Sequence, residues 1–201
     1  MIPKLIQLHD FWGDGATDVN ETAKRYQSIM PSYDVRVYNE VPKGFSADGW
    51  GGLLDVDLPS RLLADVVRYW MLMTFGGFYV DADTIPLRPF DTLLDHGAFV
   101  SSDTGTPYFC FAGSPIGEQV WKKALKLCLG KRYPRKRHYN IASTWSALSS
   151  EVAMLPQSAV SDRFHEWPSV DAYIIHKYQS IDMDTTPDLA AGPRCAGCRE
   201  L

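Results

Sequence analysis

The sequence predicts an α/β protein with a mostly parallel central sheet flanked by helices. Apolar, strand-like runs alternate with helical segments from the N-terminus onward, which is the order that builds parallel sheets. The chain has 201 residues, 45% of them hydrophobic, so it is long enough to bury a substantial core. We see neither an internal repeat nor a linker, and we therefore expect one domain over residues 1–201.

The first elements follow a strand–loop–helix–strand order. Residues 2–9 form an apolar run, residues 21–30 resemble a short helix that Pro31 ends, and residues 33–38 alternate like a strand. In doubly wound sheets that begin this way, ligands bind at the carboxyl ends of the strands. We therefore expect residues 9–12 to face a binding site.

The central segment runs from residue 60 to residue 90, behind a Gly-rich stretch, residues 41–57, that we expect to be irregular. Ser60 is a candidate N-cap of a long helix, and Gly76-Gly77 should end that helix and start a turn. Residues 78–80 are β-favouring and too few for another helix, so they predict a short strand.

The central helix is apolar almost all round and is therefore expected to be buried. Its polar residues Arg61, Asp65 and Arg68 form one stripe at helical spacing. Buried charges are costly unless they are paired or meet a polar ligand. The stripe is therefore either an internal ladder of ion pairs or one wall of a charged cleft.

The later chain predicts further elements around a basic cluster. We expect strands over residues 98–102, 108–112 and 170–175, and helices over residues 118–129 and 140–150. The basic cluster, residues 131–138, is either a solvated loop or a loop that closes over an anion. Cys110 and Cys128 are expected to be buried thiols, and Cys195 and Cys198 lie in a flexible tail.

One acidic motif stands out by its context. Three Asp-x-Asp triplets occur, and a chain this rich in aspartate produces some by chance. Only Asp81-Ala82-Asp83 follows an apolar strand and precedes an extended segment bounded by Pro86. At strand spacing Tyr79, Asp81 and Asp83 share one face, so the two carboxylates can converge on one ligand.

A family resemblance rests on four segments. Residues 2–6 (IPKLI), 64–69 (ADVVRY), 75–84 (FGGFYVDADT) and 86–87 (PL) resemble the glycosyltransferases with a sugar-binding region containing DXD. That family includes yeast-type mannosyltransferases and the glucosylating domain of large clostridial toxins. The resemblance implies a single GT-A domain. Its nucleotide- and metal-binding half would cover about residues 1–90 and its acceptor half about residues 91–190, before the tail.

The resemblance also implies an activity and a donor site. It implies retaining transfer of a hexose from a nucleotide diphosphate, with a UDP-sugar favoured, to a saccharide or glycoprotein acceptor. No carboxylate can be named as a nucleophile, so the expected mechanism is front-face attack with the diphosphate taking the acceptor proton. The residues expected around the donor are His9, Trp12, Asp65, Arg68, Tyr79 and Asp81. Trp12 is either a platform for the base or a loop aromatic that caps the core.

A divalent cation, Mn²⁺ or Mg²⁺, is expected to neutralise charge on the leaving diphosphate. Carboxylates suit such hard cations, and Asp81 and Asp83 are the candidates. The resemblance implies that Asp83 binds the cation directly, and that Asp81 contacts the ribose or reaches the cation through a water molecule. A third ligand usually comes from near the C-terminus in GT-A enzymes. His176 is the expected residue, with Ser180 as a weaker substitute.

Two other functions fit part of the pattern. Residues 80–85 also fit the nucleophile motif of a haloacid-dehalogenase-like phosphatase, although Asp14 and Asp18, which imitate its metal motif, precede that strand instead of following it. The acidic turn could also belong to a non-catalytic sugar- or calcium-binding module, although calcium usually requires more oxygen ligands.

Composition excludes other classes. The net charge of −4 and pI of about 5.7 argue against a nucleic-acid binder. The longest apolar stretch, residues 62–80, contains Asp65 and Arg68, so we expect no transmembrane segment. Four cysteines are too few for a disulfide scaffold, and we see no signal peptide, so we expect a cytosolic protein.

Overall fold

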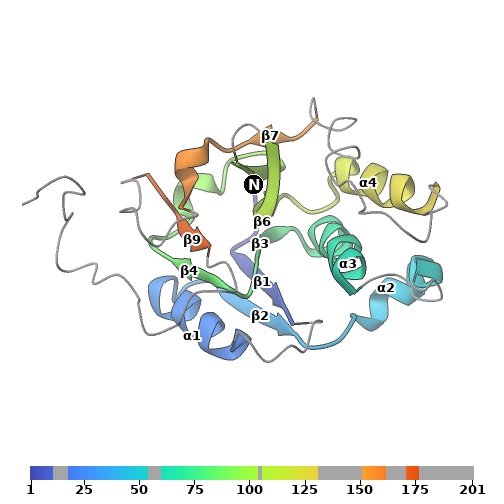
Figure 1. Cartoon of the computed structure of the whole chain (residues 1–201), viewed down its shortest axis with the longest axis horizontal. Coiled ribbons are helices and arrows are strands. Elements are labelled where there is room, and N and C mark those ends of the chain that lie inside the picture. The colour runs from blue at the N-terminus through green and yellow to red at the C-terminus, as the bar shows by residue number, and fades with distance from the viewer. Residues whose placement is uncertain (11–17, 54–59, 104–105, 131–150, 162–170, 177–201) are drawn as a thin grey trace, which may run out of the picture.

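A computed structural model gives the fold (Figure 1). It describes residues 1–10, 18–53, 60–103, 106–130, 151–161 and 171–176. Several predictions lie outside the described residues: those for Trp12, the basic cluster, the helix over residues 140–150, Ser180 and the cysteine pair near the C-terminus.

The main sheet has six strands in the order β2-β1-β3-β6-β5-β7. Its strands are β1 (Leu5–His9), β2 (Asp34–Tyr38), β3 (Gly77–Val80), β5 (Phe99–Asp103), β6 (Thr106–Ser114) and β7 (Ala153–Met154). Strand β1 pairs in parallel with β2 and β3, and β5 pairs in parallel with β7. Only β6 runs against its neighbours in this sheet. The predicted α/β class with a mostly parallel sheet is confirmed.

A smaller sheet has the order β4-β9-β8 and joins distant parts of the chain. Its strands are β4 (Thr84–Pro86), β8 (Val160–Ser161) and β9 (Ile174–His176). Strands β4 and β9 are antiparallel, with Thr84 opposite His176. This pairing brings the last described residues beside the segment that follows the Asp81-Ala82-Asp83 motif.

Helices cover both faces of the main sheet. In Figure 1, α1 (Val19–Ile29) lies on one side together with β4 and β9, whereas α3 (Ser60–Phe75) and α4 (Gln119–Gly130) lie on the other. Helix α1 begins after Asp18, whose carboxylate accepts hydrogen bonds from the next turn. The described residues also contain three short 3₁₀ helices: Gly51–Leu53, Asp91–Leu93 and Gln157–Ala159.

The expectation that residues 41–57 are irregular is wrong in part. Residues Lys43–Ala47 form the short helix α2. Its Phe45 is fully buried and packs edge-to-face on Trp70 of α3, with ring centroids 5.8 Å apart. A segment of one helical turn has too little periodicity to be recognised from sequence, and here a tertiary contact stabilises it.

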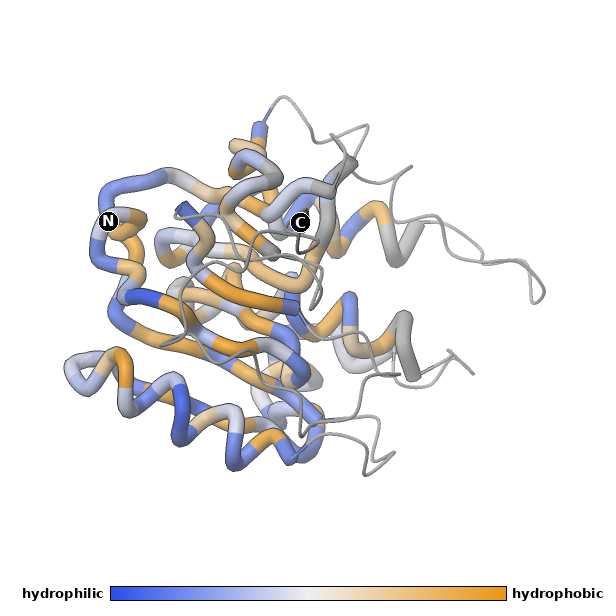
Figure 2. The backbone as a smooth tube through the Cα atoms, turned by 60° about the vertical axis from the view of Figure 1, so that its left-hand side comes forward, coloured by the Kyte–Doolittle hydropathy of each residue, from blue (hydrophilic) through white to orange (hydrophobic). Residues whose placement is uncertain are grey.

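Alternate residues of the central strands face two separate apolar clusters. Phe78 and Val80 of β3 pack with α1, whereas Tyr79 between them packs on the side of α3. Figure 2 shows apolar strands in the interior and mixed colouring along α1, as expected for a helix with one face on the core. Cys110 is a buried thiol in β6, as predicted.

The Gly76-Gly77 pair connects α3 to β3. Both residues have positive φ, 61° and 82°, a region that favours glycine. A Cβ at Gly77 would lie 2.5 Å from the carbonyl oxygen of Leu5, so no larger residue fits beside β1 there. The predicted helix stop is confirmed, and it sets β3 directly against β1.

Candidate functional site

Asp81 and Asp83 lie at the carboxyl end of β3, in the turn that leads to β4. Strand β3 ends at Val80, so the expectation that both aspartates continue the strand is corrected. Asp81 does share a side with Tyr79, whose hydroxyl donates to its Oδ1 at 2.7 Å. Asp83 lies in the turn, outside the strand, and its carboxylate still comes close to that of Asp81.

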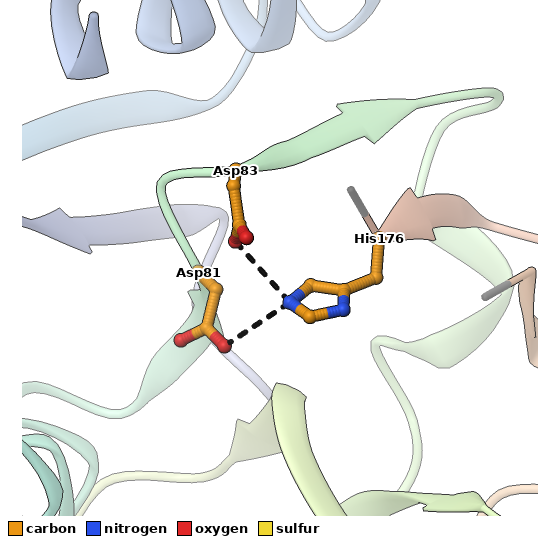
Figure 3. A group of neighbouring side chains, drawn as sticks. All are labelled: Asp81, Asp83 and His176. Atoms are coloured by element: carbon orange, nitrogen blue, oxygen red, sulfur yellow. Dashed lines mark ion pairs between the residues drawn. The ribbon is translucent and has the colours of Figure 1, made fainter. Parts of the chain in front are cut away.

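The two aspartates meet His176 from β9 (Figure 3). His176 Nε2 lies 3.2 Å from Asp83 Oδ1 and 3.7 Å from Asp81 Oδ2. One ligand atom from each of the three residues lies within 4.8 Å of the others. The antiparallel pairing of β4 with β9 therefore creates a group with the composition of a cation site.

A buried ion-pair network adjoins this group on the side of α3. The guanidinium of Arg68 lies 3.2 Å from Asp65 Oδ1 and 3.5 Å from Asp81 Oδ1. It also donates to the carbonyl oxygen of Phe109 at 2.9 Å and lies 4.6 Å from the ring centroid of Tyr79. The predicted polar stripe is thus an ion pair that extends to Asp81. The Arg61 side chain lies outside what the structure describes.

Burial changes the acid–base behaviour of Asp65. Its side chain is 13% exposed, and burial raises its pKa from 3.8 to about 6. The positive charge of Arg68 opposes this increase, and the negative charge of Asp81 adds to it. Asp65 therefore changes charge in a range where many carboxylates are fully ionised.

His9 and Tyr79 form a second buried contact behind Asp81. His9 ends β1, and its Nε2 lies 2.9 Å from the Tyr79 hydroxyl oxygen. Burial, together with the charge of Arg68, lowers the pKa of His9 well below its ordinary value, so the imidazole is neutral. Burial raises the pKa of Tyr79 well above its ordinary value, so this side chain keeps its proton.

Sequence reasoning missed the residues that hold the backbone of the turn. From α1, Thr22 Oγ1 donates to the carbonyl oxygen of Ala82 at 2.7 Å. Thr84 Oγ1 donates to the carbonyl oxygen of Asp81 at 2.6 Å and also contacts the Tyr26 hydroxyl at 2.8 Å. Thr22 and Tyr26 are four residues apart on one face of α1, a spacing that could have indicated a shared partner.

A family comparison agrees with this geometry. Residues 16–100 match the family model described as "Glycosyltransferase sugar-binding region containing DXD motif". The match covers the DXD region of the chain. It confirms the predicted resemblance to these glycosyltransferases and agrees with the predicted enzyme class. A search of curated protein sequences found no match.

Solved structures of glycosyltransferases share the fold. One is involved in glycosylation of the major capsid of PBCV-1 (TM-score 0.56, 11% identity, covering 88% of this chain and 95% of that one). Another is the PaToxG glycosyltransferase (TM-score 0.52, 14% identity, covering 75% of this chain and 69% of that one). A third is galactosyltransferase LgtC, solved in complex with donor and acceptor sugar analogues (TM-score 0.50, 12% identity, covering 86% of this chain and 86% of that one). At these identities the likeness shows the fold, and the predicted GT-A fold of this glycosyltransferase is confirmed.

The glycosyltransferase shows no membrane-spanning helix among its described residues. None of the helices in those residues is both long enough and apolar enough to cross a bilayer.

Proposed function

We propose that the chain is a metal-dependent hexosyltransferase. It moves a sugar from a nucleotide diphosphate donor, with a UDP-sugar favoured, to a hydroxyl of a saccharide or glycoprotein acceptor, in the cytosol. The observation that carries this proposal is the group of Asp81, Asp83 and His176 next to the Asp65–Arg68 ion pair. In this proposal residues 1–90 bind the donor and supply two of the three cation ligands. His176, the third ligand, comes from the acceptor half, which follows in the same domain.

The residues present fit a divalent cation. Asp81 and Asp83 supply carboxylate oxygens, and His176 supplies an imidazole nitrogen. The site has three carboxylates, Asp65, Asp81 and Asp83, beside the guanidinium of Arg68, so a divalent ion can balance the remaining negative charge. A nitrogen ligand with two oxygens suits Mn²⁺ better than Ca²⁺, which argues against the calcium-binding alternative.

Each side chain of the site has a proposed task. A bound cation supplies Lewis-acid neutralisation of the leaving diphosphate, and Asp81, Asp83 and His176 would hold it. Asp65 accepts hydrogen bonds from sugar hydroxyls. Arg68 supplies a fixed positive charge in a water-poor environment, where it acts strongly.

His9 and Tyr79 are proposed to act on the donor site without touching the donor. Their side chains are only 2% and 0% exposed, so they act on the donor site through Asp81. Trp12, which lies outside the described residues, remains the proposed platform for the base.

The proposed reaction needs no enzyme nucleophile. The carboxylates of the site are engaged: Asp65 with Arg68, Asp81 with Tyr79 and Arg68, and Asp83 with His176. The acceptor oxygen forms a bond to the anomeric carbon while the bond from that carbon to the diphosphate oxygen breaks. The acceptor proton passes to the departing diphosphate. The glycosyltransferase family match and the fold argue against the phosphatase alternative.

Thermal melting tests this function directly. Wild type and Asp83→Ala are melted with UDP, GDP or UDP-hexoses, each with and without Mn²⁺. A ligand at a hundred times its Kd adds about 2.7 kcal/mol to the free energy of unfolding. We expect UDP to raise the Tm only with Mn²⁺, and Asp83→Ala to abolish that increase.

Asp95→Ala is the matched control, because Asp95 is an exposed aspartate that does not belong to the Asp81-Ala82-Asp83 motif. It should keep the wild-type increase. If only GDP raises the Tm, the donor is a GDP-sugar and not a UDP-sugar. If no nucleotide raises the Tm with any metal, the proposed function is contradicted.

A further inference from the structure

We propose that His9 is a positioning residue for the cation site. Through the Tyr79 hydroxyl, His9 holds one oxygen of Asp81 inside the protein, so that the other oxygen faces the cation. This inference rests on the proposed function, because it assumes that Asp81 is a ligand. It assigns to His9 a task that requires no contact with the donor.

The two oxygens of Asp81 have different partners. Oδ1 accepts the Tyr79 hydroxyl at 2.7 Å and lies 3.5 Å from the Arg68 guanidinium. Oδ2 points to the opposite side, 3.7 Å from His176 Nε2 (Figure 3). The carboxylate is therefore divided between a protein side and a cation side, and Tyr79 is the hydrogen-bond donor that fixes the protein side.

Counting protons gives the direction of the contact between His9 and Tyr79. A tyrosine hydroxyl has one proton, and Tyr79 uses it toward Asp81. The His9 Nε2 atom at 2.9 Å must then donate its own N–H to the Tyr79 oxygen. Neutral His9 can do so in the tautomer with the proton on Nε2. Two hydrogen bonds in series polarise one another, so the first strengthens the second.

The surrounding packing keeps this relay in one arrangement. Strand β1 is parallel to β3, with Gln7 opposite Tyr79, and the rings of His9 and Tyr79 lie 5.2 Å apart. The guanidinium of Arg68 covers the Tyr79 ring. His9, Tyr79 and Arg68 are at most 6% exposed, so the Tyr79 hydroxyl is shielded from water as an alternative partner. Partners of metal ligands commonly change metal affinity by about 10- to 100-fold when they are lost.

Direct titration of Mn²⁺ into the full chain, followed by the EPR signal of free Mn²⁺, tests the relay without an activity assay. Tyr79→Phe should weaken Mn²⁺ binding about tenfold or more, and His9→Leu by a smaller factor of about three to ten. His9→Gln should bind nearly as tightly as wild type, because its amide N–H replaces the Nε2–H donor. The double variant His9→Leu/Tyr79→Phe should bind no more weakly than Tyr79→Phe alone.

The double variant separates a relay from a general structural role. A His9 that only supports the fold would weaken binding by the same factor in both backgrounds, and that result would overturn the proposal. Wild-type affinity in folded His9→Leu would also overturn it. If His9→Leu does not fold, as checked by near-UV circular dichroism, His9→Asn replaces it, because its shorter amide does not extend to Tyr79.

Asp83→Ala, titrated alongside, separates failure of the relay from failure of the proposed function. If Asp83→Ala loses Mn²⁺ and His9→Leu does not, the cation site stands and the relay is wrong. If wild type binds no Mn²⁺, or Asp83→Ala binds it normally, the proposed cation site fails and the relay fails with it.

Discussion

The surroundings of Asp81 and of Asp83 differ, although the two residues belong to one motif. Asp81 is held by the protein at its backbone and at one carboxylate oxygen: its N–H donates to the carbonyl oxygen of Cys110, and its carbonyl oxygen accepts from Thr84. Its carboxylate meets Tyr79 and Arg68. Among the described residues, the Asp83 carboxylate meets only His176.

Because of this difference, we expect the two aspartates of the motif to have different roles. A positive side chain of the protein already compensates the charge of Asp81, so Asp81 contributes to folding as well as to the site. No described cation other than His176 compensates the charge of Asp83, and a histidine has a positive charge only when protonated. In the proposed cation site, Asp83 is therefore the aspartate that lacks a permanent positive partner among the described residues, and Asp81 is the one that the protein holds in place.

Substitution of each aspartate by asparagine gives the largest contrast. Both variants should lose about 10³-fold in Mn²⁺-dependent transfer, because charge stabilisation by a metal supplies several kcal/mol. Asp81→Asn should also lower the free energy of unfolding by about 1–3 kcal/mol, because it weakens hydrogen bonds to a charged group. Asp83→Asn should change it by about 0.5 kcal/mol or less.

Urea unfolding in EDTA and a donor-turnover assay measure these two effects separately. Equal loss of stability in both variants would show that the protein does not distinguish the two aspartates as its contacts indicate.

Arg68→Met tests the charge compensation around Asp81. It leaves Asp65 and Asp81 buried without their cation, which should lower the free energy of unfolding by about 3 kcal/mol. Lys123→Met is the matched control, because Lys123 pairs with Glu151 at the surface. That change should cost less than about 1 kcal/mol. Urea unfolding measures both changes. If Arg68→Met and Lys123→Met lower the free energy of unfolding by similar amounts, the buried ion-pair network is contradicted.

The pH dependence of stability tests the buried network around Asp81 further, because Asp65 and Asp81 both lie beside Arg68. Burial raises the pKa of Asp65 from 3.8 to about 6, so the folded chain binds this proton more tightly than the unfolded chain. Its contribution is fully present below pH 3.8 and is lost as the pH rises through 6, by about 2–3 kcal/mol. The stability of wild type relative to Asp65→Asn should therefore fall from pH 4 to pH 7.

Urea unfolding of both proteins in EDTA at several pH values checks this expectation. Taking the difference between the two proteins removes the contributions of other titrating groups. A flat difference, or one that increases with pH, would refute the assignment to Asp65.

Tyr26→Phe has the smallest expected effect and tests the support from α1. Since Thr84 gives its proton to the Asp81 carbonyl oxygen, Tyr26 donates to Thr84. Losing that bond should cost about 1 kcal/mol of stability and only a few-fold in Mn²⁺ affinity. Tyr173→Phe, whose hydroxyl contacts Thr92 in an exposed position, is the control and should cost less. A larger loss of Mn²⁺ affinity than Tyr79→Phe causes would mean that α1, not His9 and Tyr79, positions the motif.

Local sequence patterns were enough to predict the local features of this protein. The helix over Ser60–Phe75, the Gly76-Gly77 turn and the strand that follows were predicted with bounds close to those observed. The neighbours Asp65 and Arg68, one helical turn apart, were predicted to lie on one stripe, and they form an ion pair. These relations depend on the fixed repeat of helix and strand, which any short stretch of sequence displays.

The tertiary structure decided the contacts between distant segments. The pairing of β4 with β9 places His176 beside Asp83, and the position of α1 places Thr22 and Tyr26 beneath the turn. The reversed strand β6 supplies the carbonyl oxygens of Phe109 and Cys110 to Arg68 and Asp81. Periodicity cannot specify these contacts, because they depend on strand order and register, which only the packing of the whole chain selects.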